Sequence, residues 1–155
     1  MSRRISTKKR FPKRDSKYDN LLVSLLINRI LQDGKKQLAK NIVYQAFELI
    51  ELKTNQNPIL ILEKAIRNSS PRVQLKAKRI GGATYQVPTP LSKFRSTNKA
   101  VTWMVEYSRK RSGKTMSLKL ANELLEAAKG QGNAIKKKEE THKMAEANKA
   151  FAQFR

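Results

Sequence analysis

The spacing of apolar residues constrains the fold of this chain more than any other feature of its sequence. Over most of the chain these residues recur every three or four positions, which is typical of helices with one buried face. One stretch differs: from Arg72 to Val87 apolar and polar residues alternate, and Gly81-Gly82 interrupts the alternation. That pattern predicts a β-hairpin. The sequence therefore predicts a mainly α fold with one two-stranded ribbon.

Local caps and stops divide the rest of the chain into helices. Asp19, Ser96 or Thr97, and Ser117 are the expected N-caps of the first, fourth and fifth helices. We expect Trp103 to be buried, and we expect the last helix, whose apolar residues are sparse, to lie on a partner. The six predicted helices cover about residues 20–32, 36–53, 58–68, 98–109, 118–129 and 133–151.

A length of 155 residues suits one compact domain with a modest core. Residues 1–17 hold many cations against the single acid Asp15, so we predict a basic arm there. The helical domain then covers residues 18–155 and includes the hairpin at 72–88, which Pro88 and Pro90 close. Because a two-stranded ribbon is marginal alone in water, we expect it to protrude and to be held by another element.

The charge balance points to a polyanionic partner. The chain has 34 Lys and Arg against 12 Asp and Glu, a formal net charge of +22. Such an excess repels itself unless a polyanion is bound, and nucleic acid is the first candidate. The alternative is a basic surface that serves only solubility. The runs and clusters of Lys and Arg along the sequence contain almost no Asp or Glu. Contact of these clusters with RNA is therefore favoured over the alternative that they are exposed only to solvent.

These clusters supply the predicted RNA contacts. Tyr85 adds to the hairpin an aromatic ring that can stack on a base or a sugar, although an ordinary surface hairpin is the alternative. Lys36 at a helix N-terminus opposes the helix dipole unless an anion lies there. The predicted RNA-binding residues are Arg3, Arg4, Lys8, Lys9, Arg10, Lys35, Lys36, Arg72, Lys76, Lys78, Arg79, Tyr85, Lys93, Arg95, Arg109, Lys110, Arg111, Lys114, Lys136 and Lys137.

The sequence argues against enzymatic, metal and cofactor sites. There is no cysteine, and the single histidine, His142, has no carboxylate cluster around it. Gly113-Lys114-Thr115 lacks the earlier glycine of a phosphate-binding loop. Glu139 and Glu140 diverge by about 100° on a helix. We therefore predict no catalytic residue, no metal and no cofactor.

A membrane partner is not expected either. No run of about 18 apolar residues is present, and the basic residues after Met1 are not followed by the apolar core of a signal peptide. We therefore expect a chain that begins as the mature protein.

Five segments carry a resemblance to a known family. They are residues 28–36 (NRILQDGKK), 42–46 (IVYQA), 78–88 (KRIGGATYQVP), 121–124 (ANEL) and 137–151 (KKEETHKMAEANKAF). In this order, and over nearly the whole chain, they resemble the small-subunit ribosomal protein seven family in its bacterial and plastid form. After Pro88, residues 89–96 depart from the valine-rich strand of that family, so the second strand is expected to end early.

The resemblance implies a fold of six helices with a protruding hairpin, and a structural role without enzymatic activity. It implies binding to the 3′ major domain of 16S-type rRNA, organisation of the small-subunit head, and a place near the mRNA exit channel and the E-site tRNA. The implied partners include neighbouring ribosomal proteins of head and platform, towards which the hairpin tip and the last helix would face.

Two further hypotheses use the same features. A free-standing, nucleoid-like DNA-binding protein fits the charge, although no helix has an obvious groove-reading face. An RNA-cleaving enzyme would need His142 as its acid or base. The ending at residues 150–155 resembles plastid-encoded members, and with the richness in Asn, Ile and Lys it favours the plastid stroma over a bacterial cytoplasm.

Overall fold

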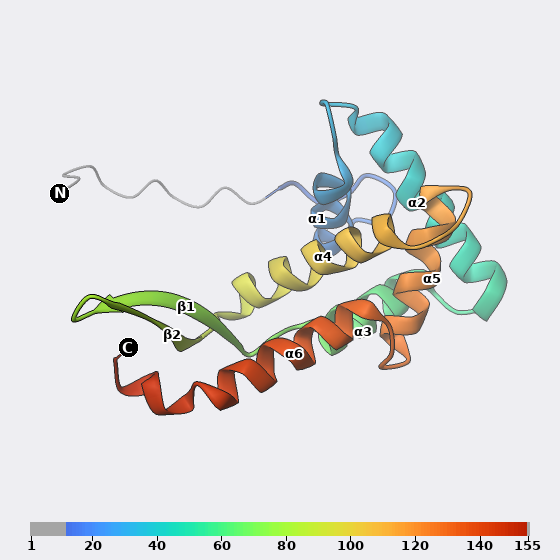
Figure 1. Ribbon diagram of the computed structural model, residues 1–155. Helices are drawn as coiled ribbons and strands as arrows, with labels where there is room; N and C mark the ends of the chain where they lie inside the picture. The colour runs from blue at the N-terminus through green and yellow to red at the C-terminus, as the bar shows by residue number, and fades with distance from the viewer. Residues whose placement is uncertain (1–11, 155) are drawn as a thin grey trace.

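The computed structural model describes residues 12–154 of the chain. Figure 1 shows the helices gathered into one body, with the hairpin and the C-terminal end of the chain extending from it in the same direction. The predicted mainly α fold, with six α-helices and one hairpin between the third and fourth, is confirmed. The elements are α1 (Leu21–Ile30), α2 (Lys36–Thr54), α3 (Pro58–Ser69), β1 (Val73–Ile80), β2 (Ala83–Pro90), α4 (Lys93–Lys110), α5 (Met116–Ala128), α6 (Asn133–Ala147) and the 3₁₀ helix η1 (Lys149–Phe154).

The core lies between the helices, with α5 against α2, α3 and α4. Its largest fully buried side chains include Phe47, Leu62, Met104 and Leu124, one each from those four helices. Burying a side chain of this size stabilises the fold by about 1.5–3 kcal/mol. Trp103 is 8% exposed, which confirms its predicted burial.

Two helix caps differ from the prediction by one or two residues. Asn20, not Asp19, caps α1, because its side chain accepts a hydrogen bond from the backbone N–H of Leu22 at 2.8 Å. Thr115, not Ser117, caps α5: it has the extended backbone that a cap requires, whereas Ser117 lies buried within the first turn. Because similar polar residues lie beside both helix starts, the sequence alone did not show which of them is the N-cap.

Helix α4 begins at Lys93, about five residues earlier than predicted. The two predicted caps lie inside the helix, where their hydroxyl groups bond to carbonyl oxygens. Ser96 donates to the carbonyl of Pro71 at 2.7 Å, and Thr97 donates to that of Lys93 at 3.0 Å. Lys93 and Arg95 therefore lie on the first turn of a helix rather than in a loop.

Strand β2 continues to Pro90, which pairs with Val73, so the strand does not end early. The backbone N–H of Leu91 donates to the carbonyl of Arg72 at 2.9 Å. Since alternate N–H groups of a strand face the same neighbour, Pro88 and Pro90 occupy outward positions where a missing N–H breaks no ladder bond. At the other end, Gly81 and Gly82 both have positive φ, as a two-residue hairpin turn requires.

The last predicted helix is divided in two. Helix α6 ends at Ala147 and η1 follows it, so the α-helix does not reach Phe151. Helix α6 contacts both strands of the hairpin, and η1 contacts β2. The buried residues of α6 are Ala134, Ile135 and Ala145, and they pack within the same chain. The element that holds the hairpin thus belongs to this chain.

Candidate nucleic-acid interface

One long stretch of the chain contains cations and no acid. The sequence has no Asp or Glu between Glu63 and Glu106, a stretch that includes the hairpin and most of α4. These elements therefore contribute cations and no carboxylate to the surface, which favours an anionic partner. The exposed cations of the stretch are Lys64, Arg67, Arg72, Lys76, Lys78, Arg79, Lys93, Arg95 and Lys99.

The strand register distributes the hairpin cations over two faces. Lys76 pairs with Val87 and Lys78 pairs with Tyr85, and paired residues share a face of the ribbon. Lys76, Lys78 and Tyr85 therefore lie together, as predicted. Arg79 lies on the opposite face, because one residue along a strand reverses the direction of the side chain. The hairpin therefore carries cations on both of its faces.

The ring of Tyr85 contacts the C-terminal end of the chain. It is half-buried, and its centroid lies 5.0 Å from that of Phe151 in η1. Aromatic pairs at such a distance stabilise by about 0.5–1.5 kcal/mol beyond the area that they bury. Tyr85 thus fastens the outer part of the hairpin to η1. Stacking of this ring on RNA stays a prediction.

The base of the hairpin is joined to α6 through His142. The backbone N–H of Arg72 donates to Nε2 of His142 at 3.1 Å, which requires an unprotonated Nε2. Burial lowers the pKa of His142, and the nearby charges of Lys138 and Arg72 lower it further. The histidine is therefore kept neutral and acts as a hydrogen-bond acceptor.

A basic groove of about 350 Å³ lies between α1, the hairpin base and α4. Arg29, Arg95 and Lys99 line it, together with the acid Glu106. The ammonium group of Lys99 lies 5.8 Å from the ring centroid of Trp103. Sequence reasoning found Arg95 but missed Arg29 and Lys99, because neither belongs to a basic run. The acid-free stretch would have signalled Lys99, whereas no sequence feature signalled Arg29.

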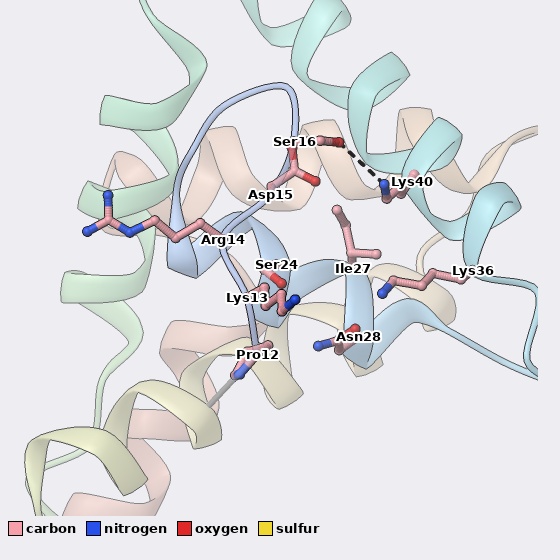
Figure 2. Close-up of a pocket in the computed structure, with 10 residues that line it drawn as sticks. All are labelled: Pro12, Lys13, Arg14, Asp15, Ser16, Ser24, Ile27, Asn28, Lys36 and Lys40. Carbon is pink, nitrogen blue, oxygen red and sulfur yellow. Dashed lines mark hydrogen bonds between the residues drawn. The ribbon is translucent and has the colours of Figure 1, made fainter. Parts of the chain in front are cut away.

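A second basic hollow, of about 320 Å³, lies where residues 12–16 pass α1 and α2 (Figure 2). Its cations are Lys13, Arg14, Lys36 and Lys40. Of these only Lys36 was among the predicted contacts. Lys35 is exposed beside it, just before α2. The predicted contacts Arg3, Arg4, Lys8, Lys9 and Arg10 lie outside the described residues.

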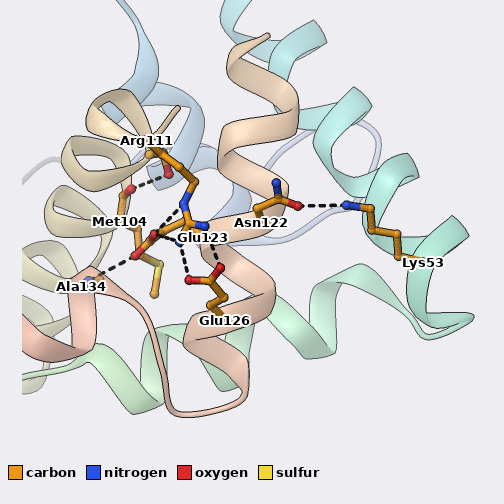
Figure 3. A network of polar contacts seen from close by, with 8 residues as sticks. Lys53, Met104, Arg111, Asn122, Glu123, Glu126 and Ala134 are labelled. Atoms are coloured by element: carbon orange, nitrogen blue, oxygen red, sulfur yellow. Dashed lines mark hydrogen bonds and ion pairs between the residues drawn. The ribbon is translucent and has the colours of Figure 1, made fainter. Parts of the chain in front are cut away.

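Arg111, a predicted RNA contact, is used inside the fold (Figure 3). Its guanidinium donates to Glu126 Oε1 at 2.7 Å and to Glu123 Oε2 at 2.6 Å. Glu123 is fully buried, and its other oxygen accepts the N–H of Ala134 at the start of α6. The hydrogen bonds with Glu126 raise the pKa of Arg111 and lower that of Glu126. Arg111 therefore joins the end of α4 to α5 and α6.

The remaining predicted contacts are nearer to solvent. Arg109 donates to the carbonyl of Ile30 at 3.2 Å, and Lys110 pairs with Glu106 at 2.8 Å. On α6, Lys137 pairs with Glu140 at 2.8 Å. Surface pairs of this kind contribute at most about 1 kcal/mol, so a phosphate can displace the acid. Lys114 and Lys136 are exposed.

Residues 12–154 contain neither a cluster of metal ligands nor a helix suited to cross a membrane. No group of three or more His, Asp or Glu side chains there lies close enough to hold a metal ion. None of the helices there has the length and apolar character that a membrane crossing requires.

Comparison with known proteins gives one family. The model of the family described as ribosomal protein S7p/S5e matches residues 1–149. The chain is similar to small ribosomal subunit protein uS7c of Trieres chinensis, with 61% identity over 144 residues that cover 93% of this chain and 91% of the relative. It is also similar to the uS7 proteins of Synechococcus elongatus and Thermosynechococcus vestitus, each 50% identical over 155 residues that cover 100% of this chain and 99% of the relative.

Proposed function

The chain belongs to the ribosomal protein S7p/S5e family, and from this premise we propose that it is a structural protein of the small ribosomal subunit that binds ribosomal RNA. The relatives are named as small-subunit proteins, and the family is one of ribosomal structural proteins, not enzymes. A binding role of this kind needs surface charge and shape rather than a catalytic constellation.

The single observation that supports RNA binding best is the basic surface formed by the hairpin and the first turns of α4, which contribute cations and no acid to it. It presents cations on both faces of the ribbon and continues into the groove lined by Arg29, Arg95 and Lys99. Several cations spread over a protruding ribbon and a groove suit many phosphates of one folded RNA. A small ligand would instead need one enclosed pocket.

The proposed target is the 3′ major domain of 16S-type rRNA, which the protein binds early in assembly to organise the head of the subunit. The resemblance of residues 78–88 and 137–151 to the family supports this target. The hairpin tip at Gly81-Gly82 and helix α6 are proposed to face the mRNA exit channel, the E-site tRNA and neighbouring proteins of head and platform. Both elements project on the same side of the body (Figure 1), which suits a shared neighbourhood.

The proposed location is the plastid stroma. A plastid relative at 61% identity supports it, and two cyanobacterial relatives at 50% keep a bacterial cytoplasm as the alternative. The genome that encodes the chain decides between them.

The proposal is tested by measuring the affinity of the full chain for separate fragments of small-subunit rRNA over a range of salt concentrations. The expected result is a clear preference for the 3′ major domain. For six to ten phosphate contacts, the affinity falls by about 10³-fold or more between about 50 and 200 mM salt.

Equal affinity for all fragments and for random duplex DNA would instead favour the nucleoid-like alternative. Sedimentation of a lysate gives an independent readout, because a subunit protein travels with small subunits.

A further inference from the structure

The turn that precedes α1 contains a buried carboxylate in a basic region. We call residues 12–19 the elbow. Asp15 is only 6% exposed. Its carboxylate accepts the N–H of Lys17 at 3.0 Å and the N–H of Tyr18 at 3.3 Å. The hydroxyl of Tyr44, on α2, lies 2.9 Å and 3.0 Å from the two carboxylate oxygens. Asp15 therefore closes the turn and ties it to α2.

Aromatic contacts fasten the same turn a second time. The ring of Tyr18 lies 5.7 Å from that of Tyr44 and 5.2 Å from that of Phe47, a core residue. The ammonium group of Lys17 lies 5.1 Å from the Tyr44 ring centroid and pairs with Glu48 at 3.3 Å. With these contacts the elbow has a fixed geometry in the free protein. A site built on a fixed element loses little conformational entropy when it binds.

The basic hollow described above lies against this fixed turn, and we call it the elbow pocket. Lys13, Lys36 and Lys40 line it, with the polar side chains of Ser24 and Asn28 (Figure 2). The other cation in its lining, Arg14, is already paired with Asp19 at 3.2 Å. Three lysines thus share a space whose one acid, Asp15, is held by Tyr44 and by the turn.

The start of α2 is electrostatically unfavourable unless an anion is bound there. Its first turn contains no acid, and the residue before it, Lys35, makes no side-chain cap. A cation at a helix N-terminus costs about 0.3–1 kcal/mol, whereas an anion there gains a similar amount. A negative partner therefore favours Lys36 on the first turn, and helix N-termini are suited to phosphate. Lys40, one turn later, donates a hydrogen bond to Ser16 Oγ at 3.4 Å and brings a further positive charge to the hollow.

We propose that the elbow pocket binds a single phosphate of the RNA backbone, and that Asp15 and Tyr44 are positioning residues that assemble it. This inference rests on the proposed function and deepens it. Lysine ammonium groups bind phosphate as point charges, and Ser24 and Asn28 add neutral hydrogen-bonding groups. Three cations that converge on one phosphate give a contact at one point of the RNA, unlike cations spread along a strand.

The salt dependence of binding distinguishes one shared phosphate from three separate ones. The test variant is Lys13→Ala, Lys36→Ala, Lys40→Ala in the full chain, measured with the 3′ major domain fragment. Its charge-matched control is Lys53→Ala, Lys119→Ala, Lys129→Ala, which removes three lysines that lie outside the elbow pocket and outside the acid-free stretch. Each neutralised phosphate contributes about 0.7–0.9 to the slope of log affinity against log salt.

The expected result is an affinity about tenfold lower for the test variant, with a slope smaller by about one. The control loses much less affinity and keeps its slope. A slope smaller by about three would mean that each lysine has its own phosphate, and would overturn the shared pocket. A loss no larger than that of the control would overturn it too. Absence of binding by the unmodified chain would instead refute the proposed function.

The positioning role is tested by Tyr44→Phe, which keeps the ring beside Tyr18 and removes the hydroxyl that holds Asp15. The expected result is RNA binding several-fold weaker in the unmodified chain and unchanged in the triple-lysine variant, because the pocket is already lost there. A hydroxyl that only stabilises the fold would weaken both backgrounds equally, and that outcome would overturn the assignment of Tyr44.

The source of the phosphate is tested with inorganic phosphate, compared with chloride at equal ionic strength. We expect inorganic phosphate to stabilise the unmodified chain against thermal unfolding slightly more than the triple-lysine variant, since the free ion presents the same oxygens to the pocket as a phosphate of RNA does. Selective protection of the unmodified chain, together with unchanged RNA binding by the variant, would show a site for free phosphate and overturn the assignment to RNA.

Discussion

The connector after α4 and the hairpin before it are both rich in cations, yet the fold uses these cations in opposite ways. In the connector, Arg111 lies between Glu123 and Glu126, and most of its side chain is buried. In the hairpin, Lys76 and Arg79 are exposed on strands that contain no acid. Strand β1 has three cations in eight residues and the connector, residues 111–115, has two in five, so the cation density along the sequence is similar in β1 and the connector. The positions of the acids determine which cations serve the fold and which are presented to a partner.

This difference also explains how a chain with so few acids stays folded. Within the described residues, two of the acids hold a single arginine at the junction of α4, α5 and α6. Exposed pairs, such as Lys110 with Glu106, contribute little. Among the ion pairs, those of Arg111 with Glu123 and Glu126 therefore contribute most to stability, and the exposed cations remain available to a partner.

The largest expected effect is that of Arg111→Met, which leaves the buried carboxylate of Glu123 without its cation. Breaking a buried ion pair from one side costs about 3–5 kcal/mol, a large part of a typical unfolding free energy. Urea unfolding followed by circular dichroism measures the loss. At temperatures where the variant is folded, we expect it to bind RNA as the unmodified chain does.

The matched control is Lys114→Met, an exposed cation of the same connector, for which a change within about 0.5 kcal/mol is expected. Equal losses for the two variants would contradict the contrast between internal and presented cations.

The hairpin is expected to give the opposite result. Lys76→Ala, Lys78→Ala, Arg79→Ala in one chain should weaken binding to the 3′ major domain about 10- to 100-fold and lower the salt slope by about two to three, because these cations lie on two faces and reach separate phosphates. Thermal unfolding should change little, since none of these side chains is buried. A large fall in melting temperature would show that the hairpin cations belong to the fold.

The smallest expected effect concerns pH and the joint between the hairpin and α6. The pKa of His142 is lowered in the fold, so the unfolded chain takes up the proton first as the pH falls below about 6.5. The contribution of His142 to stability is therefore complete above that pH and declines below it. Melting temperatures at about pH 7.5 and about pH 5 measure this decline.

The comparison variant for this prediction is His142→Gln, whose amide does not titrate in this range. It should lose less stability between the two pH values than the unmodified chain does. An identical decline in both would remove His142 from the explanation.

The helical part of the fold was predictable because the apolar pattern of a helix depends on residues only three or four positions apart in the sequence. The start of α3 at Pro58 follows from neighbouring residues, whereas the first helix was predicted to reach about residue 32 and ends two residues earlier, at Ile30. The start of α4 was not predictable in this way. The hydroxyl of Ser96 donates a hydrogen bond to the carbonyl of Pro71 across the base of the hairpin, and this partner is distant in the sequence. The continuation of β2 through Pro90 likewise could not be predicted locally, because it depends on whether the backbone nitrogens of Pro88 and Pro90 face away from β1.

The candidate interface was predictable where cations cluster along the chain and not where the fold brings them together. Lys76 and Lys78 were identified from one short run. Lys40 enters the elbow pocket from the second turn of α2, and no local pattern distinguished it from an ordinary helix lysine. The ion pairs of Arg111 within the fold were not predicted for the converse reason, because Glu123 interrupts the apolar stripe of α5 and its buried position was not recognised.

The hydrogen bond between Arg72 and His142 joins residues 70 positions apart, and Tyr85 meets Phe151 across a similar interval. During translation the ribbon therefore leaves the exit tunnel well before the segment that supports it. Because the chain is made from its N-terminus, the hairpin reaches its final position late in the folding of each new molecule. Until then its two strands have only one another, and a two-stranded ribbon of this kind is marginally stable in water.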